Sequence, residues 1–244
     1  MAELKVCNVS KSFDGRKIIE DISIELKEGE IVSLLGTSGG GKTTLFNVIA
    51  GLYEPDNGRI FLDGKDITGK SGHVSYMLQK DLLLPYKSIE DNVALPLILK
   101  GMKKKEAREQ VSEFFQEFGI EGTQKKYPHQ LSGGMRQRAA LLRTYMFSSE
   151  VALLDEPFSA LDTLTKREMH KWYLGVMEKI KLSTLFITHD INEAILLSDR
   201  IYLLTGNPGN ITHMIDIKKR EHRQEGFELT EEFLEYKKRI IQML

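Results

Sequence analysis

Short runs of apolar residues, each bounded by turn-forming residues, recur along this chain of 244 residues. The runs are too short for typical helices. They predict strands that are buried on both faces, as in a parallel sheet. The runs are Ile31–Leu35, Val74–Leu78, Val151–Leu154, Leu185–Thr188 and Ile201–Leu204.

Helical patterns lie between these runs. Helices are expected at Thr43–Ala50, Lys166–Ile180 and Asn192–Leu197, and a further helix is expected to end at Gly119. The apolar face of that further helix would carry Ala107, Val111, Phe114, Phe115 and Phe118. Strands that alternate with helices predict an α/β fold.

Other parts of the chain depart from this alternation. The first ~30 residues alternate apolar and polar positions, which predicts antiparallel strands. The stretch Glu54–Lys70 is rich in turn residues and predicts a hairpin. From about Tyr86 to Arg143 the pattern is almost wholly helical, which indicates an inserted helical subdomain.

A closing helix is predicted at the C-terminus, where Thr230 could cap its first turn. An apolar face with helical spacing supports it. That face carries Leu229, Phe233, Tyr236, Ile240 and Leu244.

The composition is ordinary for a soluble globular protein, with 41% hydrophobic and 28% charged residues. The net charge of -1 gives no global positive field that would attract nucleic acid or anionic lipid.

The single cysteine, Cys7, cannot form an intrachain disulfide and fits a reducing compartment. Neither a signal peptide nor a span of ~20 apolar residues is expected, so membrane contact would go through another protein. A local basic cluster, interpreted as a solvated helix start, comprises Lys103, Lys104, Lys105 and Arg108.

The glycines after the predicted strand Ile31–Leu35 have the spacing of a phosphate-binding loop. The pattern G-x-x-x-x-G-K-S/T stands between a strand and a helix, and glycines let several backbone N–H groups approach one anion. The helix start adds its positive end. The Lys42 ammonium is expected to reach the β- and γ-phosphates of ATP, and the Thr43 hydroxyl to ligate Mg²⁺. The expected nucleotide-binding set in this loop is Gly36, Thr37, Ser38, Gly39, Gly40, Gly41, Lys42, Thr43 and Thr44.

Two acids follow the strand Val151–Leu154. Adjacent strand residues point to opposite sides, so Asp155 and Glu156 can serve two tasks. Asp155 is expected to reach Mg²⁺ through a water, and Glu156 to act as general base on the attacking water. Pro157 is expected to hold Glu156 in an extended backbone. The alternative is a pair of acids that cap the next helix.

A second phosphate-binding device lies within the helical insert. The run from Leu131 to Arg138 places Ser132 as an N-cap before Gly133 and Gly134, which expose N–H groups at a helix start. A monomer does not need two such devices for one γ-phosphate, which favours a head-to-tail dimer in which each copy closes the other's ATP site. The alternative is an ordinary capped amphipathic helix.

With these motifs, the chain resembles ATP-binding cassette (ABC) ATPases over roughly residues 3 to 205, and the run LSGGMRQR resembles that family's signature. The resemblance implies a P-loop NTPase (RecA-like) core with an antiparallel β-subdomain and an inserted helical subdomain. It implies that Phe13 stacks on adenine and that Asp162 lies in a loop at the dimer interface. It also implies that Gln79 touches Mg²⁺ and senses the partner, and that His189 contacts the γ-phosphate. Thr37 and Gly40 depart from the family's usual residues without loss of a chemical group.

Local stretches around Tyr76–Tyr86, Asp91–Pro96 and Ile191–Ala194 resemble importer ATPases of the nitrate/sulfonate/taurine group. The resemblance implies a homodimer on the cytoplasmic face of the membrane, peripheral to two permease subunits and serving an external substrate-binding protein for a small solute. No nucleic acid partner is implied. The segment Leu82–Tyr86 either lines the permease groove or simply packs the helical insert.

The expected organisation is a single ABC ATPase domain over residues 1–244. Residues 1–79 and 147–205 would form the nucleotide-binding core with the β-subdomain, 80–146 the helical subdomain and 206–244 a C-terminal extension. Three alternatives are a non-transport ABC ATPase, a P-loop kinase and a nucleotide-gated binding module without turnover. The missing coiled-coil insert and zinc cysteines argue against the first, and the signature helix with Glu156 argues against the second.

Overall fold

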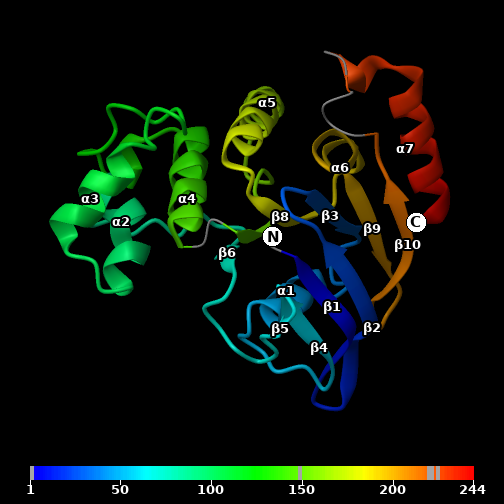
Figure 1. Ribbon diagram of the computed structural model, residues 1–244. Coiled ribbons are helices and arrows are strands. Elements are labelled where there is room, and N and C mark those ends of the chain that lie inside the picture. The colour runs from blue at the N-terminus through cyan, green and yellow to red at the C-terminus, as the bar shows by residue number, and fades with distance from the viewer. Residues whose placement is uncertain (1–2, 148–149, 219–222, 224–225) are drawn as a thin grey trace.

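The computed structural model describes residues 3–147, 150–218, 223 and 226–244. Its central sheet has six strands (Figure 1). From edge to edge they are β10 (Asn210–Asp216), β9 (Arg200–Thr205), β3 (Ile31–Gly36), β8 (Ser183–Thr188), β7 (Val151–Asp155) and β6 (Ser75–Met77). Strand β10 is antiparallel to β9, and the other five strands are parallel to one another.

The parallel strands of this sheet are the five apolar runs expected from the sequence. Strands β3, β7 and β8 are buried along their whole length, as strands covered on both faces must be. Helices make the crossover connections that parallel strands require. They are α1 (Lys42–Ile49) after β3, α5 (Thr163–Ile180) between β7 and β8, and α6 (Ile191–Leu197) between β8 and β9. The α/β prediction is confirmed.

A second sheet has four antiparallel strands, in the order β2 (Arg16–Leu26), β1 (Leu4–Phe13), β4 (Asn57–Leu62) and β5 (Lys65–Asp66). The inward residues of β1 and β2 share a hydrophobic core with Leu45 and Phe46 of α1. Asp63 and Gly64 both have positive φ and make the tight turn between β4 and β5. This sheet therefore flanks the helix that follows the phosphate loop.

Helices fill the chain between β6 and β7. They are α2 (Ile89–Leu99), α3 (Lys104–Ser112), the 3-10 turn η1 (Pro128–Gln130) and α4 (Gly133–Phe147). Helix α2 packs against both α3 and α4, and the three stand to one side of the central sheet (Figure 1). Lys104 and Arg108 pair with Asp91 of α2 at 3.0 and 2.8 Å, so part of the basic cluster joins two helices.

The helix expected to end at Gly119 ends earlier, at Ser112. The next residues form turns, in which the Gly119 amide donates to the Gln116 carbonyl at 3.0 Å. Phe115 and Phe118 are nevertheless buried, as the apolar spacing predicted. Aromatic side chains lower helix propensity because they lose rotamer freedom against the preceding turn, and here turns bury both rings.

The C-terminal part adds β10, the 3-10 turn η3 (Phe227–Leu229) and α7 (Glu231–Met243). Thr230 caps α7, since its Oγ1 accepts a hydrogen bond from the Phe233 amide at 3.2 Å. Phe233 is buried against α6, but Leu229 is 83% exposed because it precedes the cap. The predicted extension 206–244 also includes residues 219–222 and 224–225, which lie outside the described part.

Within the described ranges, no helix combines the length and apolarity needed to cross a membrane.

Candidate functional site

The phosphate loop connects β3 to α1 at the carboxyl edge of the central sheet. A β-carbon on Gly36 would lie 2.3 Å from the Leu204 carbonyl oxygen of β9, so only glycine fits there. Gly41 has φ +91° and precedes α1, and a β-carbon there would lie 2.5 Å from Ile19 Cγ2. No described side chain caps α1 at Gly41. The first N–H groups of the helix thus remain available for an anion.

Lys42 lies over this loop. Its Nζ donates to the carbonyl oxygens of Gly36 and Thr37 at 2.9 and 2.7 Å. The residue is only 5% exposed, and burial lowers the pKa of Lys42, while Glu156 and Asp155 oppose that change. A buried ammonium held at the mouth of a glycine loop is suited to bind phosphate oxygens.

Thr43 and Asp155 bring two oxygen ligands together. The Thr43 hydroxyl donates to Asp155 Oδ2 at 3.1 Å, which joins the first turn of α1 to the end of β7. Burial raises the pKa of Asp155, and the hydrogen bond from Thr43 opposes that rise. Hydroxyl and carboxylate oxygens are the ligands that Mg²⁺ prefers, so the residues present fit this ion.

Glu156 follows at the end of β7 with a backbone φ of +46°. The expectation that Pro157 holds Glu156 in an extended backbone is therefore wrong. The Glu156 amide donates to the Ile187 carbonyl of β8 at 3.1 Å, and Ser159 donates from its amide and its hydroxyl to the Glu156 carbonyl. These contacts impose the left-handed conformation. Such strain, of the order of 1 kcal/mol, often marks functional positions.

Gln79 and His189 converge on the Glu156 carboxylate. Gln79 Nε2 donates to Glu156 Oε2 at 3.1 Å. His189 Nδ1 lies 3.3 Å from Glu156 Oε1. Because Gln79 follows β6 and His189 follows β8, the parallel sheet places all three side chains at one edge.

A hollow of ≈ 750 Å³ opens beside these three residues. Its wall continues through the segment 80–83 and reaches Gly133 and Arg136 at the start of α4. A group bound against Glu156 would therefore also face the segment after Gln79.

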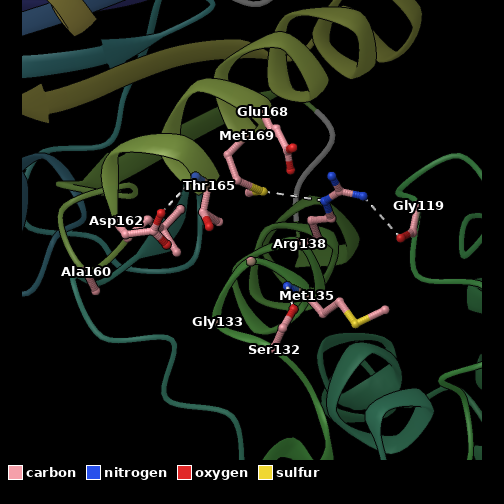
Figure 2. A pocket seen from close by; sticks show the side chains of 12 residues that line it. Gly119, Ser132, Gly133, Met135, Arg138, Ala160, Asp162, Thr165, Glu168 and Met169 are labelled. Carbon is pink, nitrogen blue, oxygen red and sulfur yellow. Dashed lines mark hydrogen bonds between the residues drawn. The ribbon is translucent and has the colours of Figure 1, made fainter.

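The signature residues line a second cavity of ≈ 490 Å³ (Figure 2). Ser132 Oγ accepts a hydrogen bond from the Met135 amide at 3.3 Å and so caps α4. Asp162 faces the same cavity and caps α5 by accepting from the Leu164 and Thr165 amides. The phosphate-loop residues are not part of its lining. Within one chain, the cavity beside Ser132 and Gly134 is thus formed without the phosphate loop.

Phe13 ends β1, outside the group around Glu156. Its ring meets Tyr53 edge-on, with centroids 5.3 Å apart, and Lys11 Nζ lies 5.4 Å from the Phe13 centroid. Both rings are exposed. Sequence reasoning missed Tyr53, because no local pattern pairs residues 40 positions apart.

The sequence profile described as ABC transporter matches residues 19–159, from the second strand through the phosphate loop and signature to the loop after β7. The chain belongs to the ABC transporter family. This ABC ATPase has the P-loop NTPase fold expected from the motifs.

Relatives and solved structures agree with this membership. The formylaminopyrimidine import ATP-binding protein ThiZ of Halalkalibacterium halodurans is 49% identical over 191 residues, covering 78% of this chain and 74% of ThiZ. The aliphatic sulfonates import ATP-binding protein SsuB of Bacillus cereus is 36% identical over 243 residues, covering 98% and 94%. The dimeric ATP-binding cassette MJ0796, in a post-hydrolysis state with ADP and Pi, is 28% identical and matches with a TM-score of 0.74 over 88% of this chain and 99% of that one.

The ABC ATPase also contains an anchor that sequence reasoning missed. Arg143 of α4 donates to the carbonyl oxygens of Asp81 and Leu82 at 2.5 and 2.8 Å. Arg136 Nε donates to Asp81 Oδ2 at 3.3 Å. The two arginines are seven positions apart and so share one helix face, which is the signal that could have indicated a common partner. They fix the segment after Gln79 to the signature helix.

Proposed function

We propose that this ABC ATPase hydrolyses ATP to drive import of a small solute through a separate permease. One observation carries this: Gln79 and His189 converge on Glu156, beside Lys42 and the Thr43–Asp155 pair. That arrangement supplies a phosphate cradle, oxygen ligands and a general base at one sheet edge. The names of ThiZ and SsuB, both import ATP-binding proteins, support the transport role.

ATP binds, in this proposal, with its phosphates in the loop from Gly36 to Thr44. The backbone N–H groups and Lys42 hold the β- and γ-phosphates. Phe13 stacks on the adenine ring, and Tyr53 supports the Phe13 ring through their edge-on contact.

Mg²⁺ would be held by Thr43, Asp155 and Gln79. When bound, this ion neutralises negative charge on the phosphate oxygens. The residues themselves position the nucleotide: Thr43 sits on the first turn of α1, and Asp155 holds the Thr43 hydroxyl in place.

Glu156 then accepts a proton from the attacking water, a role usually worth ~10²–10⁴ in rate. Gln79 and His189 orient its two oxygens, and His189 also contacts the γ-phosphate. Hydrogen bonds to β8 and Ser159 fix the Glu156 backbone, and the contacts with Gln79 and His189 set the direction of its carboxylate.

The ATP site is completed by a second copy of the chain. Ser132, Gly133 and Gly134 of one protomer bind the γ-phosphate held by the other, and Asp162 lies at the interface. Two observations support this: no phosphate-loop residue of the same chain lines the signature cavity, and the MJ0796 cassette is dimeric with ADP and Pi bound.

The wider assembly follows from the same proposal. The dimer lies on the cytoplasmic face of the membrane, under two permease subunits served by an external binding protein. The cargo is a nitrate-, sulfonate- or taurine-like solute or a small organic precursor. Residues 1–79 and 147–205 act as the nucleotide-binding core, 80–146 as the moving helical subdomain and 206–244 as the extension.

The test reconstitutes the chain in vesicles with the permease that is encoded beside it. Phosphate release and solute uptake are measured together. Phosphate should be released to water without any acceptor, and uptake should need ATP. Transfer of the phosphate to a small-molecule acceptor would instead identify a kinase. ATP binding without turnover, even with permease present, would identify a nucleotide-gated binding module. Copurification with nucleic acid or ribosomes in place of a permease would identify a non-transport ABC ATPase.

A further inference from the structure

A buried polar pair joins α5 to α6, away from the groups assigned above. His170 Nε2 and Glu193 Oε1 lie 2.9 Å apart, and their side chains are only 8% and 3% exposed. A buried carboxylate is costly unless it is hydrogen-bonded. Replacing such a pair with apolar residues is often neutral or stabilising, so stability alone gives little reason for this pair.

On one side the pair reaches the segment that carries His189. Asp190, the next residue, caps α6 by accepting from the Asn192 and Glu193 amides at 2.9 and 3.3 Å. Lys166 Nζ, one turn before His170 on α5, lies 3.7 Å from Asp190 Oδ2. Two polar contacts from one face of α5 thus fix the first turn of α6.

On the other side the pair reaches the loop that carries Glu156. The His170 ring meets the Phe158 ring edge-on, with centroids 5.0 Å apart. Phe158 is buried and lies between Glu156 and Asp162 in the chain. The next residue, Ser159, is hydrogen-bonded to the Glu156 carbonyl through both its amide and its hydroxyl.

We propose that His170 is a positioning residue. Through its hydrogen bond with Glu193 it keeps the His189 side chain close to the Glu156 carboxylate. The imidazole contacts the Phe158 ring of the Glu156 loop and, through Glu193, the helix that begins after His189. Without that hydrogen bond, α6 can shift relative to the loop, and the 3.3 Å approach of His189 to Glu156 is lost. The inference rests on the proposed ATPase function.

The experiment compares kcat and KM for ATP hydrolysis in His170→Phe and His170→Gln. Phe keeps a ring against Phe158 but removes the ring nitrogen, so kcat should fall about tenfold, as small misplacements of reacting groups do, with KM little changed. Gln restores an amide donor to Glu193 and should return kcat to near the parent value. Equal kcat in His170→Phe and the parent overturns the proposal, and so does a Gln variant as impaired as the Phe variant.

A second variant separates positioning from stability. The double change His170→Phe with Glu193→Leu removes the buried carboxylate along with its partner and should melt at or above the parent temperature. Its kcat should still be reduced about tenfold, for the same positional reason. A double variant with parent kcat overturns the proposal, even if the single Phe variant does not fold.

The matched control is Arg167→Gln. Arg167 also lies on α5, but pairs with Glu228 of η3 at 3.1 Å, on the outer surface. It should keep the parent kcat; an equal loss would make the effect a general property of α5 and overturn the proposal. A parent chain that hydrolyses no ATP, alone or with permease, overturns the proposed function instead and is recognised before any variant is compared.

Discussion

Gln79 donates a hydrogen bond to Glu156 at 3.1 Å, although 77 residues separate them in the chain. The bond joins the segment after β6 to the loop after β7. The same segment is anchored on the signature helix through Arg143. These contacts connect the helical insert to the proposed general base.

The first prediction concerns Glu156→Gln. The amide keeps the size of the side chain but cannot accept a proton from water. ATP binding should persist, an ATP-bound dimer should accumulate and turnover should fall by at least ~10². Phosphate release and light scattering with ATP measure these outcomes.

The control for that variant is Glu121→Gln, an exposed glutamate of the helical insert. It should hydrolyse ATP at the parent rate. Parent-rate hydrolysis by Glu156→Gln would show that another group removes the proton.

The second prediction concerns the raised pKa of Asp155. The folded chain then binds a proton more tightly than the unfolded chain, so this group loses stability as pH rises above its ordinary value of 3.8. Without Mg²⁺, Asp155→Asn should therefore raise the melting temperature at pH 7, by on the order of 2 °C. The gain in melting temperature should vanish near pH 4. Separately, the variant should lose Mg²⁺-dependent turnover. Melting curves from pH 4 to 8 measure the first effect.

Asp162→Asn gives the opposite sign and serves as the comparison. Hydrogen bonds from Thr165 lower the pKa of Asp162. Its ionised form stabilises the fold above pH 3.8, and that stability is lost as pH falls. Asp162→Asn should lower the melting temperature at neutral pH. Equal shifts in the same direction for both variants would contradict the electrostatic argument.

The local parts of this site could be predicted from sequence. The phosphate loop and the Asp155–Glu156 pair are written in adjacent residues, and the apolar runs beside them specify buried parallel strands. The parallel sheet then brings Gln79 and His189 to the same edge. Their own residue patterns do not indicate this, and only the family resemblance predicts it. The roles of these residues stay predictions.

The remaining features depend on contacts between distant parts of the chain. The left-handed backbone of Glu156 follows from hydrogen bonds to β8 and Ser159 that override the local preference before proline. The early end of α3 reflects tertiary burial of Phe115 and Phe118 in turns. The His170–Glu193 pair joins two helices whose packing no single stretch of sequence records.

The third prediction concerns Gly36→Ala. The added methyl would lie 2.3 Å from the Leu204 carbonyl oxygen, so the backbone of β9 or of the phosphate loop must move. We expect a loss of about 1–3 kcal/mol of stability together with weakened ATP binding. Denaturant-induced unfolding measures the stability, and nucleotide titration measures the ATP affinity.

Gly175→Ala is the contrasting substitution. Gly175 lies inside α5, and a β-carbon there would meet nothing within 4 Å. Because alanine favours helix over glycine, this variant should gain about 0.5–1 kcal/mol and keep its ATP affinity. Similar losses in both variants would show that close approach to Leu204 is not what requires glycine at position 36.

The fourth prediction concerns Arg143→Met, which keeps an unbranched side chain but removes both hydrogen bonds to the Asp81 and Leu82 carbonyls. Leu82 has a φ of +44°, a conformation that needs such support. The segment 80–86 should loosen while the phosphate loop and Glu156 stay intact. Basal ATP hydrolysis should therefore stay near the parent rate, and stimulation by the permease should fall roughly 5–10-fold, the size of a typical coupling free energy.

Paired ATPase assays with and without permease measure this difference, and Lys105→Met on the exposed face of α3 is the matched loss of a positive charge. If Arg143→Met is stimulated as strongly as Lys105→Met, the carbonyl anchor carries no coupling and the segment after Gln79 is held by Arg136 and local packing alone. If basal hydrolysis falls as far as stimulated hydrolysis, Arg143 acts on the chemical step through Gln79 and Glu156. A selective loss of stimulation is the outcome expected if the segment Leu82–Tyr86 lines the permease groove, because Arg143 holds the start of that segment.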